Sequence, residues 1–188
     1  MHQTNRKRTS ILVGPWGGNV GDSWDDGSIY HGVREITLAY GSCIDSIHVV
    51  YDNNGKPVTV NKHGGTGGDG TVKITLDYPE EFLVSLRGYY GNHRNSTVIK
   101  SLMFKSNRRT YGPFGREGGT PFKLTIESGS VVGFMGRSGW YIDSIGFYIS
   151  HPPLPPPPPP PPATSATTPK RLQAFQRKLH RLATTGSK

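Results

Sequence analysis

The sequence is poor in cysteine and has no long hydrophobic run. Cys43 is the only cysteine among 188 residues, which excludes a disulfide bond within the chain. No apolar stretch approaches the roughly 20 residues that a membrane-spanning helix needs. The first ten residues are charged and no apolar segment follows them, so they are not typical of a secretory signal. From these absences we expect a cytoplasmic or nuclear protein.

Ligand spacing typical of a metal site is also missing. The seven histidines are scattered, and none has the spacing of a zinc site. No histidine marks Cys43 as a nucleophile, and we interpret it as a small, unreactive residue. A glycosidase would need an acid and base pair such as Asp22 with Asp143, and no pattern supports that pair. We therefore expect no metal, no cofactor and no enzymatic activity.

Acidic residues are absent from both ends of the chain. The formal net charge of +9 suggests nucleic acid or a membrane surface as a partner. Residues 10–150, however, hold 13 Lys and Arg and all 13 Asp and Glu, so this stretch is neutral. Any binding of a polyanion is therefore expected only of the segments before and after it.

Composition divides the chain into four parts. We expect residues 1–9 to be a disordered basic segment and residues 10–150 to be one globular domain. Residues 151–162 predict a stiff polyproline II rod, which is a spacer or a ligand for a proline-binding groove. Residues 163–188 predict a basic amphipathic helix, or a segment disordered in isolation. This tail is a candidate contact for an anionic surface or a partner protein.

The domain is rich in glycine, which separates short alternating apolar runs. The runs contain many β-branched and aromatic residues, and none keeps a helical period. They predict an all-β domain, with strands within residues 33–38, 44–51, 71–76, 82–86, 98–104, 122–126 and 142–149.

Two kinds of segment recur three times. Three glycine-rich loops match: PWGGNVGDSW (15–24), KHGGTGGDGTV (62–72) and PFGREGGTPF (113–122). Three strand starts match: GSCIDSI (41–47), STVIKSL (96–102) and GWYIDSI (139–145). This repetition predicts three antiparallel sheets in a pseudo-threefold arrangement around a shared core.

The repeated loops have the chemistry that a sugar site needs. Paired glycines leave backbone N–H groups open to close approach, because no Cβ shields them. A Gly-x-x-x-Asp segment adds a fixed carboxylate, and sugar hydroxyls bind well to a carboxylate and several amides. The structural alternative is that the glycine pairs are turns or bulges, and that Asp45 and Asp143 cap a turn through their own backbone.

Several longer motifs are more specific: GPWGGNVGDSWDDG, YGPFGREGGTPF and GFMGRSGWYIDSIGFYI. They resemble the jacalin-related lectins of plants, and the resemblance covers residues 10–150. It implies a β-prism of three four-stranded, Greek-key-like sheets that binds carbohydrate without a metal. We further expect a homo-oligomer, either a dimer or a tetramer.

The resemblance also implies a primary sugar site, made by Gly21 and the segment from Gly139 to Asp143. Asp143 would accept hydrogen bonds from two hydroxyls at one end of a hexose. The amides of Trp140 and Tyr141 would bind the same end and the ring oxygen. The Gly21 amide would meet a hydroxyl on the far side.

The internal repeat predicts a second site, because residues 41–45 have the same form as residues 139–143. A few family members, of the banana type, use this site. Its residues here would be Gly41, Ser42, Cys43, Asp45, Gly67 and Gly68. The third repeat has Lys100 in place of the carboxylate, and a cation cannot accept a hydrogen bond. We therefore expect two sites and not three.

Mannose or glucose is the expected sugar. The galactose-preferring branch also carries two aromatics where this chain has Trp140 and Tyr141, but its chains are cleaved before the binding glycine. Here the chain is continuous from Gly14 through Gly21, although Val20 replaces a glycine found in many mannose-binding members. Two alternatives stay open: a galactose-preferring lectin, and a scaffold that acts through its proline-rich and basic segments.

Overall fold

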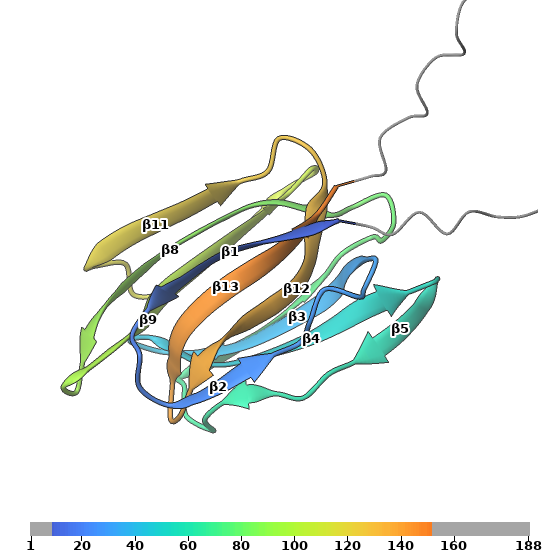
Figure 1. Ribbon diagram of the computed structural model, residues 1–188. Coiled ribbons are helices and arrows are strands. Elements are labelled where there is room, and N and C mark those ends of the chain that lie inside the picture. Colours follow the sequence, from blue (N-terminus) through green and yellow to red (C-terminus); the bar gives the residue numbers. More distant parts are fainter. Residues whose placement is uncertain (1–8, 152–188) are drawn as a thin grey trace, which may run out of the picture. The chain divides into compact units, whose positions relative to one another are not determined.

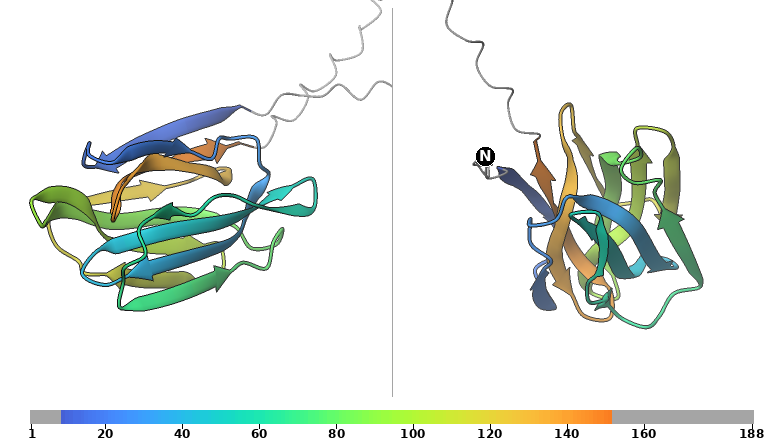
Figure 2. Two further views of the ribbon diagram at one scale, coloured as in Figure 1. Left: turned by 90° about the horizontal axis from the view of Figure 1, so that it is seen from below. Right: turned by 90° about the vertical axis from the view of Figure 1, so that its right-hand side faces the viewer.

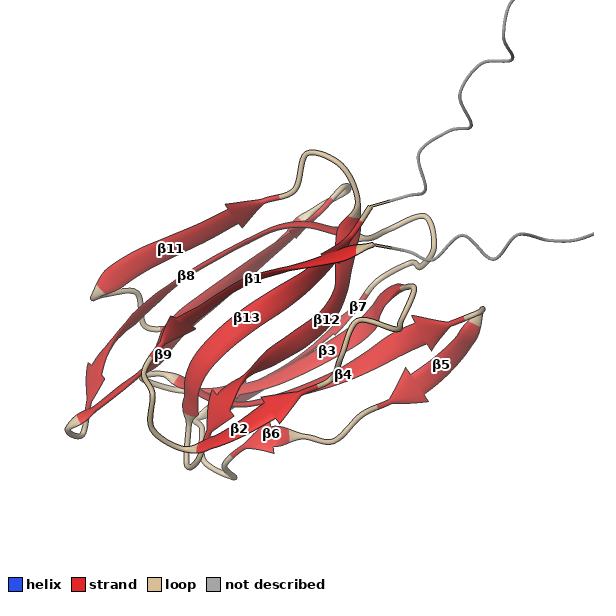
Figure 3. Ribbon diagram, in the orientation of Figure 1, coloured by secondary structure: helices blue, strands red, loops and turns tan. Residues whose placement is uncertain are grey.

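The computed structural model describes residues 9–151, and every regular element in this range is a β-strand (Figures 1 and 3). The predicted basic start, proline-rich rod and tail lie outside it, apart from Thr9 and His151. No helix that could span a membrane is found within residues 9–151. The strands are β1 (Ser10–Gly17), β2 (Asp22–Asp25), β3 (Gly32–Tyr40), β4 (Ile44–Asn53), β5 (Lys56–Thr59), β6 (His63–Gly64), β7 (Gly70–Thr75), β8 (Leu83–His93), β9 (Ser96–Ser106), β10 (Thr110–Gly115), β11 (Thr120–Thr125), β12 (Ser130–Ser138) and β13 (Ile142–Ser150).

The strands form three antiparallel sheets, with the orders β1-β13-β12-β2, β10-β9-β8-β11 and β5-β4-β3-β7. In each sheet the two inner strands form a hairpin. A glycine-rich loop connects the two outer edges of the sheet, from β1 to β2, from β6 to β7 and from β10 to β11. The first sheet joins both ends of the described chain, since β1 and β2 pair with β13 and β12. Figure 2 shows the sheets on separate sides of one interior. The predicted three-sheet prism is confirmed.

One sheet differs from the expected four strands because its outer strand is split. Both β5 and β6 pair with β4, and residues 60–62 separate them. In the other two sheets the same edge is one strand with a bulge. Beyond the break, His63 pairs with Ile47 as Trp16 pairs with Ile145, so the threefold register is kept.

Strand alternation turns one face of each sheet into a common apolar core. Its fully buried side chains come from all three sheets: Ile36, Leu38, Ile47, Leu86, Leu102, Phe104, Phe134, Ile145 and Phe147. Trp16 stacks on Phe122 with ring centroids 5.0 Å apart, and Trp24 stacks on His63 at 4.0 Å. The interior is therefore filled by side chains, so a ligand has to bind at the surface of the prism.

Candidate functional site

Each glycine-rich loop lies against one of the repeated strand starts. Three amide-to-carbonyl hydrogen bonds are equivalent: Gly18 to Asp143 at 2.8 Å, Gly65 to Asp45 at 2.9 Å and Arg116 to Lys100 at 3.0 Å. The predicted partnership of loops and strand starts is thus present three times. The backbone is alike in each repeat, so the side chains decide what each can bind.

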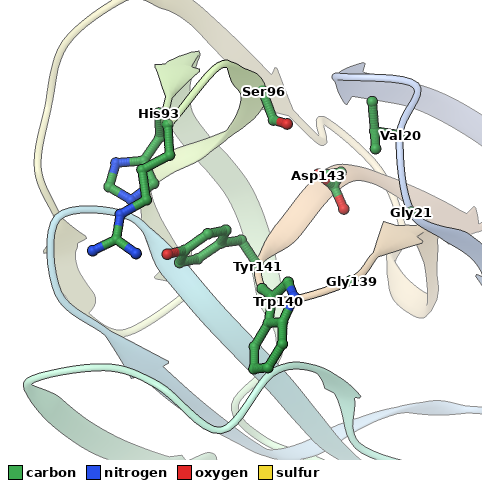
Figure 4. A pocket seen from close by; sticks show the side chains of 9 residues that line it. Val20, Gly21, His93, Ser96, Gly139, Trp140, Tyr141 and Asp143 are labelled. Carbon is green, nitrogen blue, oxygen red and sulfur yellow. The ribbon is translucent and has the colours of Figure 1, made fainter.

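One pocket contains all five residues predicted for the first site. It has a volume of about 460 Å³ (Figure 4). Its lining residues are Val20, Gly21, His93, Arg94, Ser96, Gly139, Trp140, Tyr141 and Asp143. The β1–β2 loop and the β12–β13 turn therefore meet here, although they lie at opposite ends of the described chain.

The Asp143 carboxylate lies against Gly21 and is largely buried, with the residue 5% exposed. Burial raises the pKa of this carboxyl, and a hydrogen bond from the Gly139 amide and the charge of Arg137 offset part of the rise. A Cβ at Gly21 would lie 2.5 Å from Asp143 Oδ2 and 2.7 Å from the Ser138 carbonyl oxygen. Because Gly21 also has a φ of 76°, another residue there would strain the loop and crowd the carboxylate.

The two aromatic residues of the pocket differ in exposure. Trp140 is 79% exposed, so its indole face is available to a ligand. Tyr141 is only partly exposed, because the His93 ring packs edge-on against it with centroids 4.9 Å apart. Figure 4 shows the Tyr141 side chain extending toward the turn that carries His93. The neighbouring sheet therefore covers part of Tyr141 and leaves Trp140 open.

Four lining residues were not predicted for this site: Val20 from the β1–β2 loop, and His93, Arg94 and Ser96 from the neighbouring sheet. The last three lie where the β8–β9 hairpin turns. Ser96 begins the matching segment STVIKSL, but no local motif marks His93 or Arg94. They reach the pocket because two repeats approach closely at Gly18, where a Cβ would overlap the Thr97 carbonyl oxygen. The Gly17-Gly18 pair therefore marks a close contact between two repeats as well as a loop.

The second predicted site repeats the contact between a glycine and a carboxylate. A Cβ at Gly67 would lie 2.6 Å from Asp45 Oδ1, and Asp45 is 5% exposed, as Asp143 is. Gly68 lies instead against the backbone of Tyr40. Gly67, rather than Gly68, is therefore the residue beside the carboxylate.

The surroundings of Asp45 differ from those of Asp143. Burial and the charge of Asp69 raise the pKa of Asp45, and His93 offsets part of the rise. Asp69 also stands beside the turn, since a Cβ at Gly41 would lie 2.8 Å from its Oδ2. The adjoining groove, of about 460 Å³, is lined by Tyr40, Gly41, Ser42, Asp69, Gly70, Gly115 and Arg116. Of the six predicted residues, Gly41 and Ser42 line this groove and the other four do not.

The Cys43 side chain is buried, with 2% of the residue exposed. Burial and the charge of Asp45 raise the pKa of its thiol to about 11, so the thiol is protonated at neutral pH. The Cys43 side chain is therefore not placed to meet a ligand. In the described part of the chain, no three His, Cys, Asp or Glu side chains form a group that could hold a metal ion.

Comparison with known proteins agrees with this geometry. Residues 13–148 match the Jacalin-like lectin domain family. Jacalin-related lectin 19 of Arabidopsis thaliana is 57% identical over 152 residues, which cover 80% of this chain and 86% of that protein. A galactose-specific lectin of Morus indica is 45% identical over 154 residues, covering 79% and 98%. A solved mannose-specific jacalin-related lectin of Morus nigra, in complex with mannose, is 52% identical with a TM-score of 0.73, covering 79% and 99%. The chain belongs to the jacalin-related lectins, a family of carbohydrate-binding proteins that are not enzymes.

Proposed function

We propose that this lectin binds mannose- or glucose-type glycans without a metal ion, chiefly in the pocket that contains Asp143. The observation that carries the proposal is the buried carboxylate beside Gly21, in a pocket of about 460 Å³. A carboxylate that lines this pocket can accept hydrogen bonds from two sugar hydroxyls. Charge-assisted bonds of this kind are stronger than bonds between neutral groups.

The backbone and the aromatics would complete the recognition. In the proposed arrangement, the amides of Trp140 and Tyr141 bind the hydroxyl end and the ring oxygen of the hexose. The Gly21 amide binds a hydroxyl on the far side. The exposed Trp140 ring offers an apolar face for a sugar ring or for the next unit of a glycan.

A second site is proposed at Asp45, with Gly67 opposite the carboxylate. Its support is the equivalent loop geometry, including the 2.9 Å hydrogen bond from Gly65 to the Asp45 carbonyl. Because the like charge of Asp69 stands beside this turn, we expect the site to be weaker than the one at Asp143.

Mannose is favoured over galactose because the chain is continuous from Gly14 through Gly21. The 52% identity to a mannose-specific lectin supports this choice. The 45% identity to a galactose-specific lectin, and the aromatic pair at Trp140 and Tyr141, keep galactose as the alternative.

Titration calorimetry of the full-length chain with methyl α-mannoside and methyl α-galactoside tests the proposal. Heat of binding for the mannoside and little for the galactoside is the expected result. The reverse order would assign the specificity to Trp140 and Tyr141. Binding of neither sugar would favour a scaffold that acts through the segments outside residues 9–151.

The expectations of a homo-oligomer and of a cytoplasmic or nuclear location stay predictions. Light scattering coupled to gel filtration would measure the number of chains per particle. Imaging of the tagged full-length protein in plant cells would test the location.

A further inference from the structure

The third repeat, which lacks a sugar-binding carboxylate, is strongly basic. Residues 82–116 contain no Asp or Glu. They contain seven cations: Arg87, Arg94, Lys100, Lys105, Arg108, Arg109 and Arg116. The rest of the domain balances this charge, so the asymmetry is local and is hidden in the neutral total for residues 10–150.

These cations differ in whether a carboxylate compensates them. Arg108 and Arg109 pair with Asp77, and Arg109 also pairs with Glu81. Arg94 is exposed, and within residues 9–151 its side chain takes part in no ion pair and no hydrogen bond. Its charge is therefore available to a ligand.

Arg94 lines the pocket of the first site, next to His93. Burial, together with the charges of Lys100 and Arg94, lowers the pKa of the His93 ring. Arg116, from the same repeat, lines the groove beside the second predicted site. The repeat that has lost its own carboxylate thus supplies an arginine to the wall of each neighbouring hollow.

The pocket consequently has two differently charged parts. Asp143 is almost completely buried and, in the proposed site, would face the hydroxyls of a hexose, whereas Arg94 is exposed on the β8–β9 turn. Tyr141, whose side chain extends toward that turn, connects the two parts (Figure 4). A substituent or second sugar unit lying along Tyr141 would meet the cationic part of the wall.

We propose that this pocket prefers glycans that carry a negative charge next to the bound hexose, with Arg94 as the residue that selects them. The inference rests on the proposed sugar site at Asp143. A guanidinium donates two parallel hydrogen bonds to a carboxylate or a sulfate, so a uronate unit and a sulfated unit have the chemistry required. A neutral unit at the same place leaves the charge of Arg94 uncompensated.

The test uses three disaccharides with the full-length protein. The first is α-mannosyl-(1→3)-glucose, the second has glucuronate in place of the glucose, and the third carries a sulfate on O6 of the glucose. Calorimetry gives the ratio of acidic to neutral affinity. For the natural sequence we expect a ratio of about 5, since the ion pair is partly exposed to solvent. The ratio should approach 1 in about 1 M salt, which screens such charges over a few ångströms.

Arg94→Gln should reduce the ratio of acidic to neutral affinity to about 1. Arg94→Lys should keep part of the preference, because the positive charge remains but the two parallel hydrogen bonds of the guanidinium are lost. Arg87→Gln is the matched control: it removes one exposed arginine from the same repeat outside this pocket, and the ratio should stay as it was.

A preference for the uronate alone or the sulfate alone would identify the acidic group that Arg94 selects. A ratio near 1 in the natural sequence, or one that survives Arg94→Gln, overturns the inference. If no disaccharide and no methyl mannoside binds, the sugar site itself is wrong.

Discussion

The two predicted sugar sites have the same backbone and different neighbours. In both, a loop amide bonds to the carbonyl of an aspartate that is 5% exposed, at 2.8 Å for Asp143 and 2.9 Å for Asp45. The first site opens into a pocket whose far wall comes from another sheet. The second has the Asp69 carboxylate beside its turn. The comparison indicates that a repeated local motif makes a site possible, and we expect the side chains around each aspartate to set how strongly the site binds.

Removing the charge of each carboxylate separates the sites most sharply. Asp143→Asn keeps the side-chain volume and replaces one acceptor oxygen by a donor. We expect about a 100-fold loss of mannoside affinity at the first site, since two charge-assisted hydrogen bonds are affected. Asp45→Asn should remove only the weaker site. Calorimetric affinity and stoichiometry for both variants measure this, and equal losses would contradict the proposed ranking.

Adding a methyl group to each glycine tests the contact that the sites share. Gly21→Ala would crowd Asp143 and Ser138 and would strain a residue with a φ of 76°. We expect about a tenfold loss at the first site and a lower melting temperature, because such strain costs about 1–2 kcal/mol. Gly67→Ala meets only Asp45 Oδ1 at 2.6 Å and should weaken the second site with little change in stability. A melting temperature that falls more for Gly67→Ala would be the opposite result.

Acidification should weaken binding through the raised pKa of the carboxylates. A protonated Asp143 loses acceptor capacity, so affinity should fall on acidification, and the fall should begin above the pH at which an ordinary aspartate takes up its proton. A raised folded-state pKa means that this group favours folding more as the pH falls, so its protonation does not unfold the protein. Glu81, whose pKa is about 2, loses its stabilising contribution only below about pH 4.5.

His93 also lines the pocket, and burial together with Lys100 and Arg94 lowers its pKa. A His93→Gln variant removes this second titrating group. The decline in affinity should persist in that variant. If it vanishes, His93 and not Asp143 controls the pH dependence.

The smallest effect concerns Asp69. In an Asp143→Asn background, where only the second site remains, Asp69→Asn removes the like charge that raises the pKa of Asp45. We expect mannoside affinity to rise about threefold. The midpoint of the decline in affinity on acidification should move to lower pH. A loss of affinity would mean that Asp69 itself binds the sugar. Asp77→Asn, which changes an exposed acid paired with Arg108 and Arg109, is the control for net charge.

The three sheets could be predicted from local patterns, but the surroundings of the site could not. Alternating apolar runs and three matching loops were enough to predict the sheets, whereas the pairing of Gly21 with Asp143 came from the resemblance to the jacalin-related lectins. The split of one edge strand at residues 60–62 has no comparable signal, because it depends on how β5 and β6 pair with β4. His93 and Arg94 enter the pocket only through the meeting of two sheets. The absence of acids from residues 82–116 was visible in the sequence, but its position in space was not.

The most direct test of the account is a titration of the isotope-labelled full-length protein with methyl α-mannoside, followed by the NMR shifts of its backbone amides. We predict that the amides of Gly21, Trp140 and Tyr141 move first, and that those of Cys43 and Gly67 move at higher sugar concentration. Shifts confined to another surface, such as the outer face around Arg87 and Lys123, or no shifts at all, would contradict it.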